Sequence, residues 1–267
     1  MIPPMSAPPD PSPFAGTAAW YARFRPPYAP GTLDAVVEAF ALDGASRVLD
    51  LGCGPGVIAI PLSERVGEVV AVDPDAEMIA EGRRLAAAAG RRNIRWIQAR
   101  AEDLPGDLGL FRAATLGQSF HWMDRDRVLE LLATLIADGG GLALINPGRR
   151  RPQETWEPTA RTVVERFLGV RPRHPGANPG EPEHEPALLR SRCFHRFTAR
   201  ELPGALTRDI ASIIGCVYST SGARRRLFGD RIGAFEIDLT AALLAASPSG
   251  DFHERIETEV LIAPRMG

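Results

Sequence analysis

The segment VLDLGCGPG at residues 48–56 constrains the fold more than any other part of the sequence. A short, mostly apolar strand here runs directly into three glycines, Gly52, Gly54 and Gly56. Glycine adopts backbone conformations that other residues avoid, and it lets a ligand lie against bare backbone. Ligands of open α/β sheets bind beyond the carboxyl ends of the strands. We therefore expect a ligand-binding turn between a buried strand and the helix that follows it.

The stretch from Arg47 to Asn146 alternates between strand-like and helix-like patterns. We expect strands at residues 47–52, 68–73, 93–99, 110–117 and 140–146, and helices at 57–67, 75–90 and 124–140. Strands separated by helices in this way indicate a parallel sheet that is covered on both faces. Right-handed crossovers then give an α/β fold with a doubly wound, mostly parallel sheet.

The alternation breaks after Asn146, and we expect the chain to form four regions. They are a flexible N-terminal tail (residues 1–14), a ligand-binding core (15–146), a largely helical elaboration (147–250) and a final strand that returns to the core sheet (251–267). Within the elaboration, the patterns indicate helices at 154–168, 204–217 and 223–246, a loop at 171–186 and a strand at 193–198.

Two acidic residues restrict the ligand of the glycine turn. Asp50 stands just before the turn, where it would repel a pyrophosphate and suit a cationic group. The third glycine comes one residue earlier than in the dinucleotide-binding pattern, and no P-loop lysine follows. Asp73 ends the second strand, a position from which a carboxylate accepts hydrogen bonds from ribose hydroxyls. The residues therefore indicate a ribose-bearing ligand with a positive group near the glycines.

Together with VVAVDPDAEMI, the glycine segment resembles the first motifs of class I S-adenosylmethionine-dependent methyltransferases. RAEDLP at 100–105 resembles the adenine-contacting segment of that family. YARFRPPY resembles the N-terminal lid, and LGQSFHWMD at 116–124 the segment after the fourth strand, of the type 11/25-like branch that includes trans-aconitate and natural-product methyltransferases. The resemblance covers roughly residues 20–147. It implies a Rossmann-like core, S-adenosylmethionine as cofactor, S-adenosylhomocysteine as product and a substrate cap at 147–250.

The resemblance assigns cofactor contacts residue by residue. The cofactor-binding residues that it implies are Tyr21, Arg25, Tyr28, Asp50, Gly52, Cys53, Gly54, Gly56, Asp73, Pro74, Met78, Ala101, Glu102 and Gln118. Arg25 and the two tyrosines would close over the methionine end of the cofactor, while the thiol of Cys53 is expected to pack rather than react. Relatives carry Asp where this chain has Arg100, so Glu102 or the backbone of Ala101 remains as the contact to adenine.

His121 is the candidate catalytic residue, because the resemblance places it near the sulfonium methyl group. A hydroxyl or amine acceptor must lose a proton, and histidine titrates near neutral pH. The alternatives are a histidine that only hydrogen-bonds cofactor or backbone, and a carboxylate acceptor that needs no base. Phe120, Trp122 and Tyr218 are candidate substrate contacts. We expect no metal site, because His184 falls in the expected loop and the histidines and cysteines lack ligand spacing.

The composition argues against a nucleic-acid-binding or membrane-spanning protein. The net charge of −2 gives no basic field for nucleic acid, and no apolar run reaches the roughly 20 residues of a membrane helix. Three widely spaced cysteines fit a reducing cytoplasm. We expect a cytoplasmic enzyme, monomer or homodimer, that methylates a small molecule such as an intermediate of natural-product biosynthesis. Two alternatives stay open: cofactor binding without methyl transfer or with another reaction, and a less favoured nucleic-acid methyltransferase.

Overall fold

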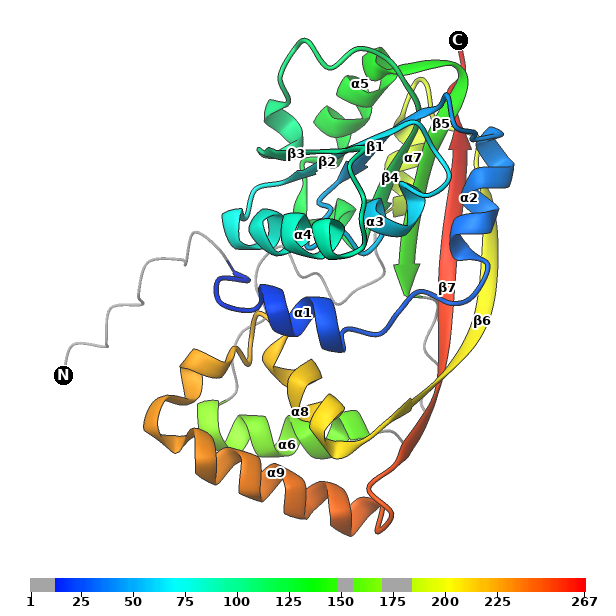
Figure 1. Ribbon diagram of the computed structural model, residues 1–267. Coiled ribbons are helices and arrows are strands. Elements are labelled where there is room, and N and C mark those ends of the chain that lie inside the picture. The colour runs from blue at the N-terminus through cyan, green and yellow to red at the C-terminus, as the bar shows by residue number, and fades with distance from the viewer. Residues whose placement is uncertain (1–12, 148–155, 170–183) are drawn as a thin grey trace, which may run out of the picture.

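Seven strands form one sheet in the order β3-β2-β1-β4-β5-β7-β6, as Figure 1 shows for the computed structural model of the chain. The structure describes residues 13–147, 156–169 and 184–267. The strands are β1 (Arg47–Leu51), β2 (Glu68–Asp73), β3 (Ile94–Gln98), β4 (Phe111–Gly117), β5 (Ile136–Pro147), β6 (Thr198–Arg208) and β7 (Phe252–Pro264). β1 to β5 run parallel, and β7 is antiparallel to both β5 and β6. The expected α/β fold with a doubly wound, mostly parallel sheet is confirmed.

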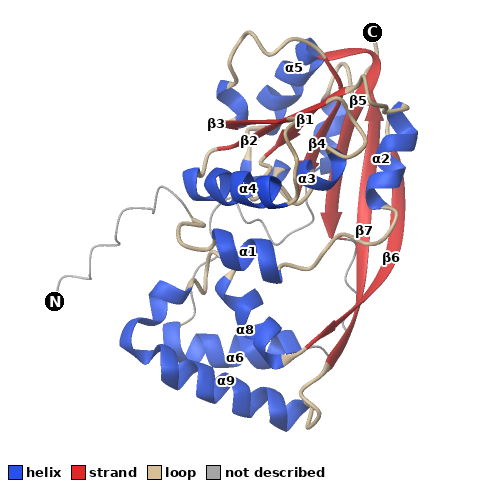
Figure 2. Ribbon diagram, viewed as in Figure 1, coloured by secondary structure: helices blue, strands red, loops and turns tan. Residues whose placement is uncertain are grey.

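Helices cover both faces of the sheet, and a further group packs at one end (Figure 2). The helices are α1 (Ala18–Phe24), α2 (Thr32–Phe40), α3 (Ala59–Leu62), α4 (Ala76–Ala88), α5 (Arg125–Leu135), α6 (Trp156–Leu168), α7 (His184–Arg190), α8 (Ile210–Tyr218) and α9 (Ile232–Ala246). Short 3-10 helices are η1 (Ala101–Asp103), η2 (Phe120–Trp122) and η3 (Arg225–Arg231).

Two hydrophobic clusters lie on opposite faces of the sheet. On one face, α2, α3 and α4 contribute Phe40, Leu62 and Ile79. On the other face, α5 and α7 contribute Leu132 and Leu188. β1 and β2 supply alternate residues to the two clusters and are buried along almost their whole length. Burial on both sides explains why these strands read as nearly continuous apolar runs in the sequence.

The carboxyl ends of the parallel strands lie at one edge of the sheet. β1 is flanked by β2 and β4, so the chain changes direction across the sheet at this point. Asp50 of β1 is in register with Ala71 of β2 and with Thr115 of β4, and Asp73 is the last residue of β2. Both carboxylates therefore lie beside the crevice in which open α/β sheets bind their ligands.

A third hydrophobic cluster forms the cap, the group of helices below the sheet in Figure 2. α6, α8, α9 and η3 enclose aromatic residues such as Tyr218 and Phe235. α1 lies between the cap and the core, and its Trp20 and Phe24 pack into the cap cluster. The expected divisions of the chain at residues 14, 146 and 250 stay predictions. Residues 1–12 of the expected tail and residues 154–155 of an expected helix lie outside the described residues.

Two expectations for the region after Asn146 are wrong. The expected strand at 193–198 is irregular up to its last residue, and β6 instead spans Thr198–Arg208, including positions 204–208 that we expected to begin a helix. β6 is an edge strand with mostly exposed side chains, and it contains Pro203 and Gly204. Its pairing with β7 runs along its whole length. Tertiary pairing therefore overrides a local pattern that does not resemble a strand.

The expected helix boundaries around the sheet also need correction. The helix expected at 124–140 ends at Leu135, because Ile136 begins β5 and pairs with Phe111 of β4. The apolar spacing continues into Ile136, but that side chain is buried in the sheet cluster. The helix expected at 57–67 is reduced to α3 with flanking turns. Of the loop expected at 171–186, residues 171–183 lie outside the described residues, and residues 184–186 instead begin the helix α7.

We predict that Gly82→Ala destabilises the protein although alanine favours helices. In α4, a methyl group at position 82 would lie 2.5 Å from the indole of Trp96 in β3. The expected loss is about 1–3 kcal/mol in the free energy of unfolding, as in other overpacked cores. Gly233→Ala in α9 is the matched control, since nothing lies within 4 Å of its added methyl group, and it should not lower stability. Urea unfolding measures both; wild-type stability of Gly82→Ala would contradict the packing.

Candidate active site

The glycine turn after β1 depends on close packing as well as on left-handed backbone. Gly52 has a φ of 65°, and a Cβ there would lie 2.4 Å from the Cβ of Ser119. The Gly52 amide donates to the carbonyl of Val72 at 2.8 Å, which ties the turn to β2. Gly56 has a φ of 86°, and a Cβ there would lie 2.7 Å from the indole of Trp96. Gly56 thus serves packing, while Gly52 faces the crevice.

Asp73 is fixed by the backbone on both sides of the crevice. Its Oδ2 accepts the amide of Gly54 at 2.9 Å, and its Oδ1 accepts the amide of Asp75 at 2.9 Å. Burial raises the pKa of Asp73 to about 6, and these two hydrogen bonds lower it in part. A carboxylate oxygen that accepts one hydrogen bond keeps a lone pair for another. Asp73 can therefore also accept from a ligand diol placed over the turn.

Asp50 is buried beneath the turn, with 1% of its surface exposed. Its Oδ1 accepts the hydroxyl of Thr115 at 2.8 Å. Its Oδ2 has no hydrogen-bond partner among the described residues. Burial raises the pKa of Asp50 to about 7; the Thr115 hydrogen bond and a smaller contribution from the backbone of Ala59 lower it in part, and the charge of Asp73 raises it. A buried carboxyl group with one unpaired oxygen favours a ligand that is cationic or donates hydrogen bonds.

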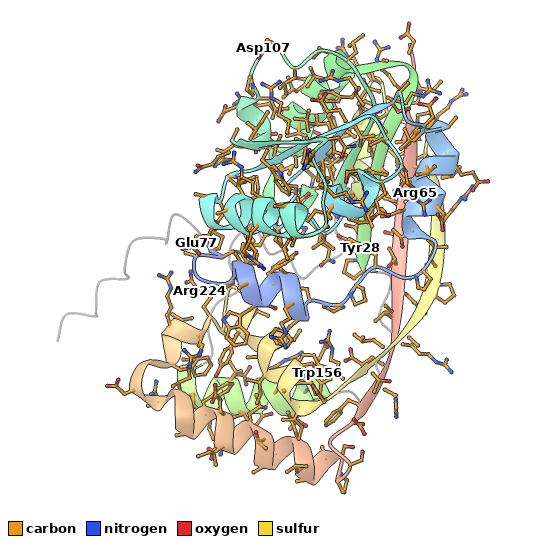
Figure 3. The ribbon with its side chains drawn as sticks, viewed as in Figure 1. Tyr28, Arg65, Glu77, Asp107, Trp156 and Arg224 are labelled. Carbon is orange, nitrogen blue, oxygen red and sulfur yellow. The ribbon has the colours of Figure 1, made fainter. Side chains whose placement is uncertain are left out.

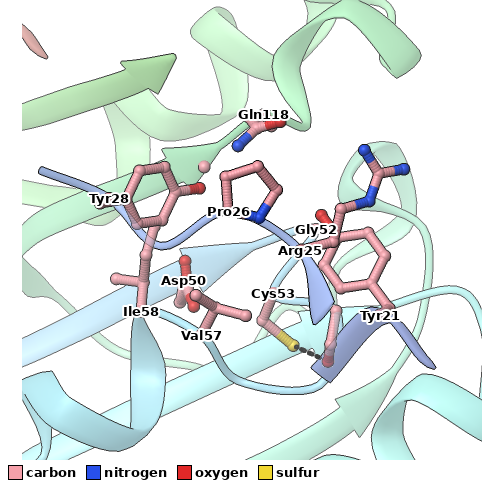
Figure 4. A pocket seen from close by; sticks show the side chains of 12 residues that line it. Tyr21, Arg25, Pro26, Tyr28, Asp50, Gly52, Cys53, Val57, Ile58 and Gln118 are labelled. Atoms are coloured by element: carbon pink, nitrogen blue, oxygen red, sulfur yellow. Dashed lines mark hydrogen bonds between the residues drawn. The ribbon is translucent and has the colours of Figure 1, made fainter. Parts of the chain in front are cut away.

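Two adjoining cavities lie over the turn. The larger has a volume of about 470 Å³, and the smaller about 30 Å³; ligand sites in proteins commonly occupy about 300–1,000 Å³. Residues that line both are Tyr21, Gly52, Gly54, Gly117 and Gln118. Predicted residues that line the larger cavity alone are Asp73, Pro74, Met78, Ala101, Glu102 and Trp122. Those that line the smaller alone, in Figure 4, are Arg25, Tyr28, Asp50 and Cys53. The structure thus gathers every predicted cofactor residue except Gly56 around these cavities.

Side chains from α1 and the segment after it close the smaller cavity. Arg25 donates from Nη2 to the carbonyl of Ser219 at the end of α8, at 3.3 Å, and its guanidinium lies 4.9 Å from the centre of the Tyr21 ring. Burial raises the pKa of Tyr28 well above its usual value, and a hydrogen bond with Gln118 lowers it in part. Gln118 has a φ of 50°, which is rare outside glycine and concentrated at functional sites.

The larger cavity ends at η1, where this sequence departs from the family that it resembles. The Glu102 side chain is 7% exposed, and its Oε1 accepts the amide of Asp124 at 2.9 Å. Arg100 pairs with Glu102 at 3.4 Å and also lines the cavity. The Glu102 carboxylate is therefore held in place at this end, and the guanidinium of Arg100 stands beside it.

Sequence reasoning missed an aromatic contact from the expected tail. Pro13 and Phe14 line the larger cavity. The Phe14 ring packs edge-on against Trp122, with centroids 5.6 Å apart, and against Tyr21 at 6.1 Å. Ser119 was missed as well, although it lines the same cavity. The available signal for Phe14 was a single aromatic residue at the end of a proline-rich run, which is too weak to indicate a contact across the fold.

Several predicted residues lie outside the lining of both cavities. Phe120 is 1% exposed in the sheet cluster, with its ring 5.4 Å from that of His184. His121 lies beside it, and burial, with Arg125, lowers the pKa of His121. His184, which we expected in a loop, is 2% exposed. Burial lowers the pKa of His184 to about 4, with smaller contributions from His121 and Arg125.

The position of Tyr218 does not fit the expected substrate contact. Tyr218 is fully buried in the cap, its ring packs near Trp20 and Phe235, and its hydroxyl donates to Glu236 at 3.0 Å. Aromatic residues in the helical region can build the cap as readily as a substrate pocket, and the sequence does not separate the two.

In the described part of the chain, no group of three or more His, Cys, Asp or Glu side chains could hold a metal ion, and no helix is long and apolar enough to cross a bilayer.

Comparison with known proteins agrees with this geometry. Residues 48–140 match a family model described as a methyltransferase domain. This part of the chain is therefore similar to methyltransferase domains. An uncharacterized methyltransferase of Mycobacterium tuberculosis is 36% identical over 132 residues, which cover 49% of this chain and 51% of that protein. A demethylmenaquinone methyltransferase of Shouchella clausii is 32% identical over 122 residues, covering 44% and 48%. The chain thus spans about half the length of these relatives.

One solved structure shares the fold over most of the chain. A methyltransferase from Thiobacillus denitrificans, in complex with S-adenosyl-L-homocysteine, superimposes with a TM-score of 0.51 at 15% identity. The match covers 93% of this chain and 97% of that one. At this identity the comparison concerns the fold, and it includes most of the region after the core.

Asp50 and Asp73 make the stability of the protein depend on pH. Burial raises the pKa of Asp50 from 3.8 to about 7 and that of Asp73 from 3.8 to about 6. At pH values between the unfolded and the folded pKa of each group, the native state therefore binds more protons than the unfolded state. Their contribution is full below the unfolded pKa and is lost as pH rises through the folded values. We predict that Asp50→Asn gains stability over wild type between about pH 5 and about pH 8 in urea unfolding. A difference that does not change with pH would contradict this, and Asp107→Asn, at an exposed position, is the control.

Proposed function

We propose that this protein transfers the methyl group of S-adenosylmethionine to a small molecule. One observation carries the proposal: the buried carboxyl group of Asp50 leaves Oδ2 without a partner beneath the glycine turn. A ligand that brings positive charge and hydrogen-bond donors to this point removes the cost of that burial. S-adenosylmethionine has an ammonium and a sulfonium group at one end, joined to a ribose. When bound, it supplies a methyl group that is already activated for transfer.

The two cavities suggest how the cofactor would be held. Asp73 would accept hydrogen bonds from the ribose hydroxyls over the larger cavity, and Met78 would pack on the adenosine. The methionine end would enter the smaller cavity toward Asp50. There the guanidinium of Arg25, which lines this small cavity, would pair with the carboxylate of the cofactor.

Methyl transfer from an activated donor needs mainly alignment and a dry site. Tyr28, Arg25 and Tyr21 supply both, because they close the smaller cavity and are themselves packed or hydrogen-bonded. His121 remains the candidate base for an acceptor that must lose a proton. Its lowered pKa keeps the imidazole neutral at physiological pH, the form that can accept a proton.

Two features support a small-molecule acceptor over a nucleic acid. The net charge is −2, which provides no general attraction for a polyanion. The cap helices lie beyond α1 from the sheet (Figure 2), and we propose that they cover a small acceptor. A role in natural-product biosynthesis belongs to the same proposal and follows from the sequence resemblance. A cytoplasmic location, which the three widely spaced cysteines suggest, and a monomeric or homodimeric state are also part of it.

We predict that Asp73→Asn weakens S-adenosylmethionine binding by about 2 kcal/mol, roughly thirtyfold, because a charged acceptor of two ribose hydroxyls is lost. Isothermal titration calorimetry measures the dissociation constant, and thermal unfolding checks that the variant is folded. Asp107→Asn is the matched control, since Asp107 lies at the far side of the sheet (Figure 3) and should leave binding unchanged. A wild-type protein that binds no S-adenosylmethionine would contradict the proposed function; unchanged binding by Asp73→Asn would remove Asp73 from the ribose contact.

A further inference from the structure

A polar side chain ends β5 at the carboxyl edge of the sheet, outside the cavities described above. Leu142 and Leu144 of β5 belong to the cluster beneath α5 and α7, whereas Ala143 and Ile145 belong to the opposite cluster. Side chains alternate along a strand, so Asn146 faces the same side as Leu144. Asn146 therefore lies on the α7 side of the sheet, next to the end of β4.

The same corner of the fold holds two histidines. Phe120 follows the end of β4 and belongs to the cluster beneath α5 and α7. The ring of His184, at the start of α7, lies 5.4 Å from the Phe120 ring and 6.4 Å from the His121 ring. We call Asn146, His121 and His184 the polar cluster. Its members come from three separate elements, β5, η2 and α7, on one side of the sheet near the ends of β4 and β5.

Two members of the polar cluster are buried without partners. Asn146 is 5% exposed and His184 is 2% exposed. Asn146 Nδ2 and His184 Nδ1 have no hydrogen-bond partner among the described residues. Asn93, by contrast, has a paired side-chain amide: its Nδ2 donates to the carbonyls of Ser63 and Val66, at 2.9 Å each. Buried polar atoms without partners cost stability, and a ligand that pairs them removes the cost.

We propose that Asn146 and His184 bind the methyl acceptor through an uncharged oxygen group, a hydroxyl or a carbonyl. This inference rests on the proposed methyl transfer and names the chemistry of its acceptor. The Asn146 amide donates to the acceptor oxygen, and the His184 imidazole forms a second hydrogen bond to the same group. His121, beside them, is then placed to take a proton from a hydroxyl.

The charge of the surroundings favours an uncharged group over an ion. Asn146 carries no charge, and burial keeps His184 neutral above about pH 4. Arg125 acts on both histidines, while Glu259 of β7 is in register with Asn146, so the nearby charges are of opposite sign. A buried ionic ligand is costly unless a side chain of opposite charge pairs with it. The polar cluster supplies only neutral donors and acceptors, so it favours an uncharged ligand.

The test uses four aromatic probes of similar size on protein saturated with S-adenosylhomocysteine. Phenol and acetophenone present a hydroxyl and a carbonyl; benzoate and benzylamine present an anion and a cation. Saturation-transfer NMR at millimolar concentration measures binding of each probe. We expect the two uncharged probes to bind and the two ions not to. Binding of phenol but not acetophenone, or the reverse, identifies the oxygen group and supports the proposal.

Asn146→Leu tests the residue directly. It should weaken both uncharged probes by about tenfold, the effect of one lost hydrogen bond, and raise the melting temperature by a few degrees because an unpaired donor is removed. Asn93→Leu is the matched control: it should lower the melting temperature and leave probe binding unchanged, since it removes two satisfied hydrogen bonds far from the cluster. His184→Phe keeps an aromatic ring and gives the same test of probe binding if Asn146→Leu does not fold.

Three results would overturn the inference. They are a cofactor-product complex that binds neither uncharged probe, equal binding of the ions, or Asn146→Leu and His184→Phe proteins that bind the probes as the wild type does. In each case S-adenosylhomocysteine binding, measured first by calorimetry, stays intact. A wild type that does not bind S-adenosylhomocysteine contradicts the proposed function, and with it this inference, so the two failures are distinguishable.

Discussion

Two carboxyl groups that the fold buries at the carboxyl edge of the sheet determine which ligands the site can accept. Asp50 and Asp73 lie at or near the ends of adjacent parallel strands, and burial raises the pKa of both. Hydrogen bonds from Thr115, Gly54 and backbone of the following turn satisfy part of each group, but Oδ2 of Asp50 stays unpaired within the described chain. Such an arrangement lowers the stability of the free protein, and a cationic ligand restores it.

The cap and the cofactor cavity are joined through α1. Arg208, buried at the end of β6, donates to the carbonyl of Phe24 at 3.0 Å and pairs with Glu254 of β7 at 2.8 Å. Arg25, which follows Phe24 in the chain, lines the smaller cavity and donates a hydrogen bond to the carbonyl of Ser219 in the cap. The residues that line the smaller cavity, which we propose holds the cofactor, are therefore positioned by the same contacts that hold the cap, which we propose covers the acceptor. Methyl transfer benefits from such a link, because it requires both reactants to be aligned at once.

The sequence predicts the parts of this protein whose side chains alone determine the local structure. β2 agrees residue for residue with the expected strand at 68–73, because its run of buried apolar residues is unbroken. The proposed cofactor residues on β1, β2 and the turns after them are those that the family resemblance implies. β6 escapes prediction because pairing with β7, rather than its own pattern, makes it a strand. The sequence does not indicate His184 and Asn146 as candidate ligand contacts. They stand out only because each is buried with an unpaired nitrogen atom, which is a property of the packed fold.

The central claim is that these carboxylates hold an adenosyl cofactor bearing an amino-acid tail. A crystal structure of the complex with S-adenosylhomocysteine tests it most directly. The account predicts ribose hydroxyls within hydrogen-bond distance of Asp73 and the amino end of the ligand in the smaller cavity beside Oδ2 of Asp50. A ligand bound elsewhere, bound in the reverse direction, or bound with Oδ2 of Asp50 still unpaired would contradict it.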